Sequence, residues 1–393
     1  MHTCSYLVVL NATKEPYHSL KRSPICMAIP KLSVFPAWAI HTTHASQLDP
    51  AIFPLLQAVR ETEKLTEAAK FAGISYRHAW NLLHQLGEAL EFPIVVRQRG
   101  RGTRLSDLGE RVLLAEQRVR ARLGPQLDSM ASEINDEIQK VVAGRNAVLR
   151  INASHGYAIS LLPQHNDQVE INLQYRNPQE ALLDLLNGRC DISSFHFPTC
   201  PFLAKRVLDH YESELNRAQL KLIRFVKRKE GLMMKPSVGP LKSLKELTES
   251  NALFIRRDTH SGTRILFDLL MEREKLTLGA VNCTSHYEYT HTAIAACVAA
   301  GMADVGFGVE AAANQFGLSF SELAEEHYLL ACREENLKLA TVQDLIGLIQ
   351  SKSVLDSVEN LPGYCPDSPG EITTFDELLS ENQGYVPSNH VAP

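Results

Sequence analysis

Four short segments of the sequence place hydroxyl and imidazole side chains where a predicted strand gives way to a helix. They read "NASHGYAISLL" (152–162), "CDISSFHFP" (190–198), "RRDTHSGTR" (256–264) and "YEYTHTAIAACVAAG" (287–301). A helix N-terminus offers free N–H groups and a partial positive charge, and a glycine allows close backbone approach. Such junctions suit an anion. The candidate ligand-binding residues are Ser154, His155, Ser194, His196, Ser261, Gly262, Thr263, Thr290 and His291.

Plain helix capping is the competing interpretation for each junction taken alone, because Ser, Thr and Asp at a helix start usually only cap it. The three histidines could equally be ordinary packed or surface residues. Asp258 is expected to cap a turn; if it pointed inward, it would accept a proton from phosphate and repel molybdate. Arg264 is expected to face solvent. What favours a binding site is that all four junctions can converge on one cleft, since ligands of open α/β sheets bind at the carboxyl ends of strands.

The sequence around these junctions has the pattern of an α/β domain. From Ala147 short apolar strands alternate with amphipathic helices, which is typical of parallel sheets. Two further apolar segments, 220–236 and 327–336, are predicted to be strands that cross between two lobes.

A second set of signals lies nearer the N-terminus and suits DNA. Residues 65–90 read as helix, glycine-containing turn and helix, the spacing of a helix-turn-helix. Residues 94–105 read as a strand pair around an arginine-rich turn, a candidate wing. A solvated charge run is the alternative, and Trp80 is expected in the core. The candidate DNA-binding residues are Thr66, Ser75, Tyr76, Arg77, His78, Asn81, Arg97, Arg99, Arg101 and Arg104.

A long helix is predicted to follow from Ser106, with apolar residues spaced by threes and fours that indicate a partner-helix seam. Gly124 and Pro125 are expected to break or bend it. The seam consists of Val119, Leu123, Leu127, Met130, Ile134, Ile138 and Val141.

Residues 50–112, with "LTEAAKFAGISYRHAWNLLHQLGEAL" and "VVRQRGRGTRLSDLGERVL", resemble the winged helix-turn-helix of LysR-type regulators, and more closely the molybdate-responsive ModE branch. Residues 148–375, with "SGTR", "THTAIAACVAAGMADVGFGVE", "HYLLACREE" and "ENLPGYCP", resemble type 2 periplasmic-binding-protein folds, specifically a molybdate-binding-like domain. The resemblance implies a homodimer or higher homo-oligomer, double-stranded operator DNA as partner, and an oxyanion held by hydroxyls and backbone N–H groups.

The predicted fold class is multidomain: an all-α winged helix-turn-helix, a linker helix and a two-lobed α/β domain. The predicted ranges are a poorly ordered extension (1–46), the DNA-binding domain (47–106), a linker or dimerisation helix (107–146), the effector domain (147–380) and a tail (381–393).

Composition limits the function classes. The 393-residue chain has a net charge of −5, which excludes a generally basic nucleic-acid coat. Its eight cysteines form no CxxC or zinc-type spacing, so we expect no metal and reduced thiols in the cytoplasm. No apolar run is long enough for a membrane helix, and no nucleophile elbow, P-loop or HExxH motif indicates an enzyme.

The sequence therefore predicts a transcriptional regulator, without a cofactor, that senses a small anion such as molybdate or tungstate. Two alternatives stay open: a LysR-type regulator sensing an organic carboxylate or phosphate, and a non-regulatory anion store.

Overall fold

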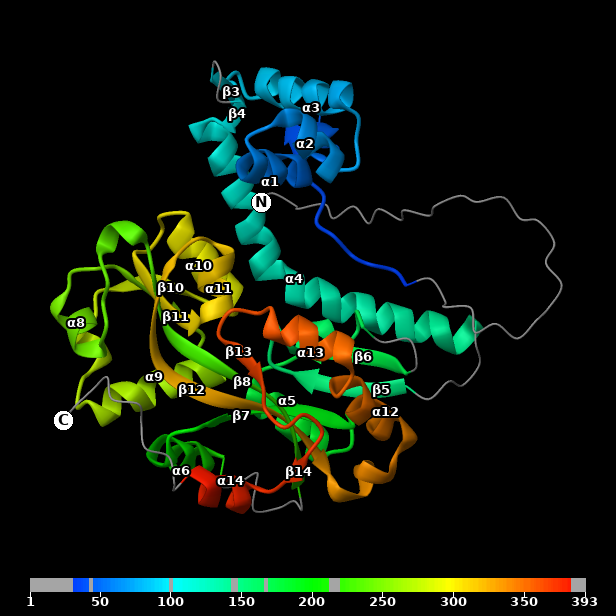
Figure 1. Cartoon of the computed structure of the whole chain (residues 1–393), viewed down its shortest axis with the longest axis vertical. Helices are drawn as coiled ribbons and strands as arrows, with labels where there is room; N and C mark the ends of the chain where they lie inside the picture. Colours follow the sequence, from blue (N-terminus) through cyan, green and yellow to red (C-terminus); the bar gives the residue numbers. More distant parts are fainter. Residues whose placement is uncertain are drawn as a thin grey trace. The chain divides into compact units, whose positions relative to one another are not determined.

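The computed structural model describes residues 31–41, 45–98, 102–142, 148–165, 169–211 and 220–382. The chain divides into two compact units, one containing Leu32–Gly124 and the other Pro125 onward (Figure 1). The predicted multidomain class, a helical N-terminal part followed by an α/β domain, is confirmed. Across the described residues, no helix is both long and apolar enough to cross a bilayer.

The first unit packs three helices and a strand pair around one apolar core. The helices are α1 (Ile52–Thr62), α2 (Leu65–Phe71) and α3 (Tyr76–Ala89), and the strands are β3 (Val95–Gln98) and β4 (Gly102–Leu105). Apolar residues at helical spacing, such as Leu55, Leu56 and Leu83, form its core. Gly73 between α2 and α3 has a φ of 68°, a left-handed conformation that glycine adopts without strain.

The expectation of a poorly ordered extension over 1–46 needs one correction. Residues 1–30 and 42–44 lie outside the described residues. Within the rest, β1 (Ala39–His41) pairs antiparallel with β2 (Ala45–Gln47), and the Trp38 ring lies 5.4 Å from that of Phe53. Aromatic burial against α1 gives this segment a reason to be structured.

The long helix α4 (Asp107–Val142) continues through Gly124 and Pro125, so of the two predicted outcomes, a break or a bend, the break does not occur. The boundary between the two units nevertheless falls between these two residues. On the part of α4 within the second unit, Met130, Ile134 and Val141 of the predicted seam are exposed.

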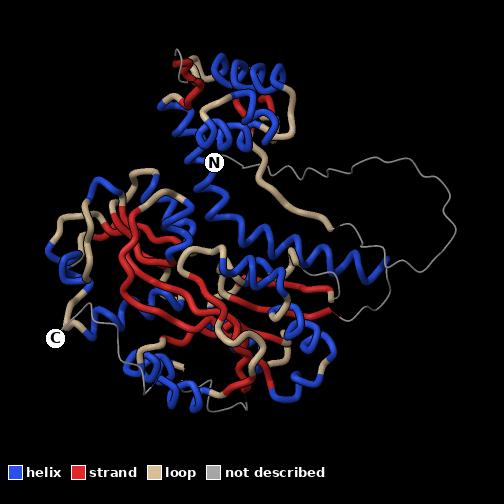
Figure 2. Tube along the Cα trace, viewed as in Figure 1, coloured by secondary structure: helices blue, strands red, loops and turns tan. Residues whose placement is uncertain are grey.

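The second unit is built on one mixed sheet with helices against it (Figure 2). The strand order is β10-β9-β11-β8-β12-β7-β5-β6. One half contains β5 (Val148–Ala153), β6 (Glu170–Tyr175) and β7 (Ile192–Pro198), all parallel. The other contains β9 (Phe254–Arg257), β10 (Cys283–Glu288) and β11 (Val305–Val309), also parallel.

Two 15-residue strands join the halves. β8 (Leu220–Met234) and β12 (Ser319–Arg333) pair antiparallel over their whole length, each with one end in either half. The predicted crossing strands are thus confirmed. Short strands β13 (Tyr364–Pro366) and β14 (Ile372–Thr373) add to β8.

The helices of this unit cover three apolar cores. They are α5 (Pro178–Leu186), α6 (Pro201–His210), α8 (Leu244–Glu249), α9 (Gly262–Arg273), α10 (His291–Ala299), α11 (Glu310–Gln315), α12 (Ala340–Ile349), α13 (Lys352–Glu359) and α14 (Phe375–Asn382).

The close approach of β8 and β12 generates a stability prediction. A Cβ added at Gly231 on β8 would lie 2.0 Å from the carbonyl oxygen of Ser321 on β12. Because backbone cannot yield as a side-chain tip does, Gly231→Ala should lower the free energy of unfolding by about 3 kcal/mol in urea titrations. Gly279→Ala, whose Cβ would meet nothing within 4 Å, is the matched control. Equal stability of the two variants would contradict this strand geometry.

Candidate effector-binding site and DNA-binding surface

Charged side chains gather at the middle of the two crossing strands. Arg228 on β8 is 1 % exposed, and its Nε and Nη2 lie 2.7 and 2.5 Å from Oε1 of Glu326 on β12. The same Nη2 lies 3.0 Å from Oε1 of Glu230, which is fully buried. Buried charges require partners of this kind, because desolvation of an unpaired ion costs several kcal/mol.

His196 on β7 joins this network through Nδ1. Arg228 Nη2 lies 2.8 Å from this atom, and Glu326 Oε1 lies 3.2 Å from it. Nδ1 accepts from Arg228 in one tautomer of the neutral ring and donates to Glu326 in the other. The other ring nitrogen, Nε2, is buried and has no hydrogen-bond partner. It can donate to a ligand in the first tautomer and accept from one in the second.

The other half of the sheet contributes Thr263 and His291 to the same network. Thr263, in the first turn of α9, donates to Glu230 Oε1 at 3.3 Å and lies 3.4 Å from His291 Nε2. His291 opens α10 and is 2 % exposed. Arg257, at the end of β9, is buried and interacts electrostatically with Glu230 and Arg228.

The end of β5 closes the network on the opposite side. The Ser154 N–H donates to Ser194 Oγ at 2.8 Å, and the Tyr328 hydroxyl donates to the Ser154 carbonyl at 2.9 Å. The His155 ring packs edge-on against Tyr175, with 5.0 Å between centroids. Side chains from β5, β7, β8, β9, β12, α9 and α10 therefore form one contiguous polar cluster.

Several polar atoms of this cluster are buried without a hydrogen-bond partner. Orphaned buried polar groups are rare, because each carries its full desolvation cost. Arginine N–H groups, a hydroxyl and an imidazole N–H together match the needs of an anion. The atoms are Ser154 Oγ, His155 Nδ1, His196 Nε2, Arg228 Nη1, Arg257 Nε and Nη1, and His291 Nδ1.

The electrostatics of the cluster keep its histidines neutral. Burial, followed by the charges of Arg257 and Arg228, lowers the pKa of His155 to about 4 and that of His291 well below its usual value. Burial and Arg228 also lower the pKa of His196. Burial opposes ionisation of Glu326, but Arg228 outweighs it and lowers the pKa to about 2. Burial beside Glu326 raises the pKa of Glu230 to about 8.

The predicted ligand residues divide into two groups in the structure. Ser154, His155, Ser194, His196, Thr263 and His291 meet in the cluster. Ser261 and Thr290 act as N-caps, with their Oγ atoms accepting from the N–H groups of Arg264 and Ala293 at 3.1 and 2.9 Å. Gly262 lies beside His196, where an added Cβ would make only an ordinary 3.4 Å contact.

Of two neighbouring expectations, one agrees with the structure and one does not. The Asp258 carboxylate accepts from the His260 N–H at 3.1 Å, within the turn that precedes α9, as expected. Arg264 does not face solvent: its side chain is 15 % exposed and pairs with Asp268 one turn along the helix at 2.8 Å.

Arg228, Arg257, Glu230 and Glu326 are absent from the sequence-based candidates. Arg257 stands in the segment "RRDTHSGTR", next to Asp258. Arg228 and Glu230 belong to a run of four charged residues (227–230) in the middle of the crossing strand, and such a run between apolar residues is a signal that a buried charge is in use.

The first unit presents the predicted recognition surface to solvent. Ser75 caps α3 by accepting from the His78 N–H at 3.2 Å, and the side chains of Thr66, Tyr76, Arg77, His78 and Asn81 are exposed. The Arg97 guanidinium lies 4.5 Å from the centroid of Trp80, a half-buried ring at the core edge. Arg104 instead pairs with Glu63 at 2.8 Å. Arg99 and Arg101 lie outside the described residues.

Residues 159–350 match the family model of the PBP superfamily domain. This part of the chain is a PBP-like domain.

Three curated proteins are similar to the chain over parts of their length. The uncharacterized protein YvgK of Bacillus subtilis (strain 168) is 27% identical over 205 residues, 51% of this chain and 64% of that protein. The molybdenum transport protein ModE of Azotobacter vinelandii is 28% identical over 86 residues, 21% of this chain and 32% of that protein. The molybdenum-pterin-binding protein MopB of Rhodobacter capsulatus is 26% identical over 126 residues, 31% of this chain and 46% of that protein. The chain thus spans less than two thirds of each.

Two solved structures are similar to the chain at low sequence identity. An OxyR mutant of Corynebacterium glutamicum has a TM-score of 0.41 at 13% identity, covering 88% of this chain and 99% of that chain. Full-length BenM has a TM-score of 0.38 at 16% identity, covering 76% of this chain and 94% of that chain. Neither likeness bears on function.

The lowered pKa of His155 generates a pH prediction. In the unfolded chain His155 titrates near 6.5, so between pH 6.5 and 4 only the unfolded state takes up its proton. Its contribution to stability is present above pH 6.5 and is lost as the pH falls to about 4, on the order of 3 kcal/mol.

His155→Asn should therefore flatten the fall in unfolding free energy over this range, measured by urea titration with far-UV circular dichroism and without added anion. His260→Asn, which replaces a histidine with an exposed side chain, is the control. A variant that loses stability as steeply as wild type would contradict a buried neutral His155.

Proposed function

We propose that the chain is a DNA-binding transcriptional regulator whose PBP-like domain senses a small anion. The anion-binding part of this proposal rests on the set of buried donors without partners around Arg228 and Arg257. An anion in that position would accept from both guanidinium groups, from Ser154 Oγ and from His196 Nε2. Binding N–H and O–H groups from both halves of the sheet, it would hold the two halves together.

Molybdate or tungstate is the proposed effector. Support comes from the sequence resemblance to molybdate-binding-like domains and from two partial relatives whose names concern molybdenum, ModE and MopB. A fully deprotonated oxyanion needs only donors, and the arginines, serine and neutral imidazoles supply them. Phosphate or an organic carboxylate in the same site is the second candidate, because the partly protonated Glu230 could exchange a hydrogen bond with such a ligand.

The partner of the first unit is proposed to be operator DNA. The exposed start of α3, with Tyr76, Arg77 and Asn81, has the side chains that reach base edges and phosphates from a major-groove helix. Arg97 extends this basic surface toward the wing. An exposed apolar row on α4, including Met130 and Ile134, supports a homodimer, which a two-fold operator would require.

The anion proposal predicts graded losses of affinity. Arg257→Gln removes two unpartnered N–H donors and a charge, so molybdate should bind roughly 10- to 100-fold more weakly in calorimetry. Ser154→Ala removes one neutral donor and should cost about fivefold. The matched control is Ser160→Ala, since the Ser160 hydroxyl bonds only its own turn at Tyr157.

Parallel titrations with tungstate, sulfate, phosphate and a series of carboxylates identify the ligand class. Binding of a carboxylate or phosphate, with no response to molybdate or tungstate, would replace the proposed effector. Failure of every anion would remove the sensor function.

The DNA proposal predicts a change in salt dependence. Arg97→Ala should weaken binding to operator DNA and reduce the slope of log K against log salt by about 1, because one phosphate contact is lost. Arg60→Ala on α1, where Arg60 donates to Gln57, is the control and should leave the slope unchanged. Fluorescence anisotropy from 50 to 200 mM salt measures both. An unchanged slope for Arg97→Ala would exclude this arginine from the interface, and a protein that binds no DNA would favour an anion store.

A further inference from the structure

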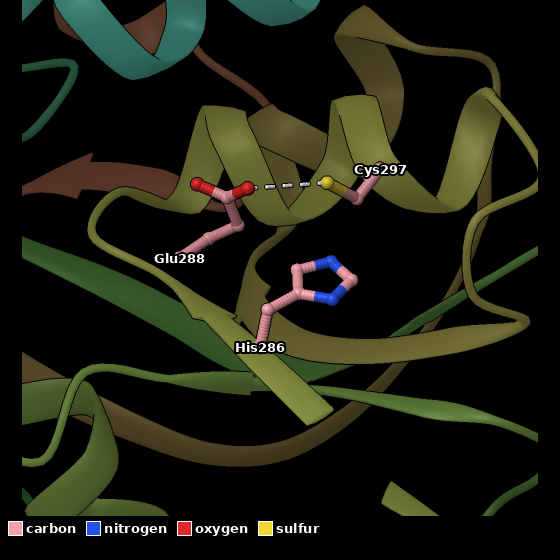
Figure 3. A group of neighbouring side chains, drawn as sticks. All are labelled: His286, Glu288 and Cys297. Atoms are coloured by element: carbon pink, nitrogen blue, oxygen red, sulfur yellow. Dashed lines mark hydrogen bonds between the residues drawn. The ribbon is translucent and has the colours of Figure 1, made fainter. Parts of the chain in front are cut away.

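A second group of potential ligand atoms lies between β10 and α10. His286 and Glu288 stand two residues apart on β10, so both side chains leave the same face of the sheet. Cys297 belongs to the buried side of α10. Figure 3 shows the imidazole and the carboxylate of β10 directed toward the helix that carries the thiol.

The distances within this group approach those of a metal centre. One ligand atom from each residue lies within 4.8 Å of the others. The Cys297 Sγ already lies 3.5 Å from Glu288 Oε1. Tetrahedral zinc, with bonds of about 2.0–2.3 Å, separates its ligand atoms by roughly 3.5 Å. The thiol and carboxylate thus have the required spacing, and the imidazole has to approach by only about 1 Å.

The chemical environment favours an ion over a hydrogen bond alone. Cys297 and Glu288 are 0 % and 2 % exposed. The His286 Nε2 is buried and has no hydrogen-bond partner, which leaves an imidazole nitrogen aimed into the group with its desolvation cost unmet. Nitrogen, sulfur and one carboxylate oxygen form a donor set that suits zinc better than magnesium or calcium, which prefer oxygen alone.

We propose that His286, Glu288 and Cys297 bind a zinc ion, with a water molecule or another small ligand in the fourth position. The Cys297 thiol loses its proton to solvent on binding, and the thiolate, the carboxylate and the neutral imidazole become the three protein ligands. The site uses different ligand atoms from the anion cluster but adjoins it. Glu288 interacts electrostatically with Arg257, and α10 contributes to both groups, with His291 at its start and Cys297 on its buried face. The proposal is independent of which anion, if any, the cluster binds.

Cobalt(II) is the probe, because a bound thiolate gives a near-ultraviolet charge-transfer band that oxygen and nitrogen ligands do not give. The full-length protein, first treated with a chelator, should develop this band on titration with cobalt and lose it when zinc is added. Cys297→Ser should abolish the band. Cys283→Ser, at the start of β10, should retain it. No band in the wild-type protein, or a band that persists in Cys297→Ser, would overturn the proposal.

Two further variants keep the test decisive if loss of Cys297 disturbs the fold. His286→Asn and Glu288→Gln each remove one ligand while leaving the thiol, so each should weaken zinc binding roughly tenfold or more in competition with a chromophoric chelator. Unchanged affinity in both would exclude the site. Ser154→Ala, which is expected to weaken anion binding and lies in the other half of the sheet, should retain the cobalt band, and this separates the two proposals experimentally.

Discussion

The charge of Arg228, held in the centre of the fold, is the constraint around which the PBP-like domain is organised. The guanidinium lies midway along a 15-residue strand and is 1 % exposed, so it depends on Glu326 and His196 to offset its desolvation. Those partners come from β12, which pairs with β8, and from β7, which pairs with β12. The strand pairing that builds the sheet therefore also builds the ion network.

One consequence is that the histidines of the cluster are neutral and do not act as cations. Arg228 and Arg257 already supply positive charge, and their proximity opposes protonation of His155 and His291. A protonated histidine would instead strengthen anion binding as the pH falls. With neutral rings, hydrogen-bond geometry decides what is bound, because His196 offers an Nε2 proton only when its Nδ1 accepts from Arg228 and does not donate to Glu326.

How far the sequence predicted this site depended on where each residue stands. Junction residues such as Ser154, His155 and Thr263 could be found, because a strand end followed by a helix start has a local pattern. Ser261 and Thr290 share that pattern, and in the structure their hydroxyl oxygens cap α9 and α10. Arg228, Glu230 and Glu326 could not be found in the same way, since they meet only through pairing of β8 with β12, nearly a hundred residues apart. The zinc-binding group was missed for the same reason, because Cys297 approaches β10 through packing of α10 and not through a ligand spacing.

The second half of α4 is hydrogen-bonded to β6, the strand at one edge of the sheet. β6 is the last strand of the sheet, and its outer N–H groups would otherwise be unpaired. Ser129 Oγ accepts from the Tyr175 N–H at 2.9 Å, and Ser132 Oγ accepts from the Leu173 N–H at 3.0 Å. Tyr175 is also the residue whose ring contacts His155 in the polar cluster.

If the PBP-like domain binds an anion as proposed, this arrangement would give the anion a short physical route to the helix that continues into the first unit. A ligand that ordered His155 would favour one position of Tyr175, whose backbone is bonded to Ser129. Coupling of this kind would be allosteric only if two positions of α4 differed in anion affinity, and the effect on DNA could be no larger than that difference. The two serine hydrogen bonds replace a neighbouring strand at this edge. Breaking them would leave the pairing of β5 with β6 intact, because β5 bonds the other edge of β6.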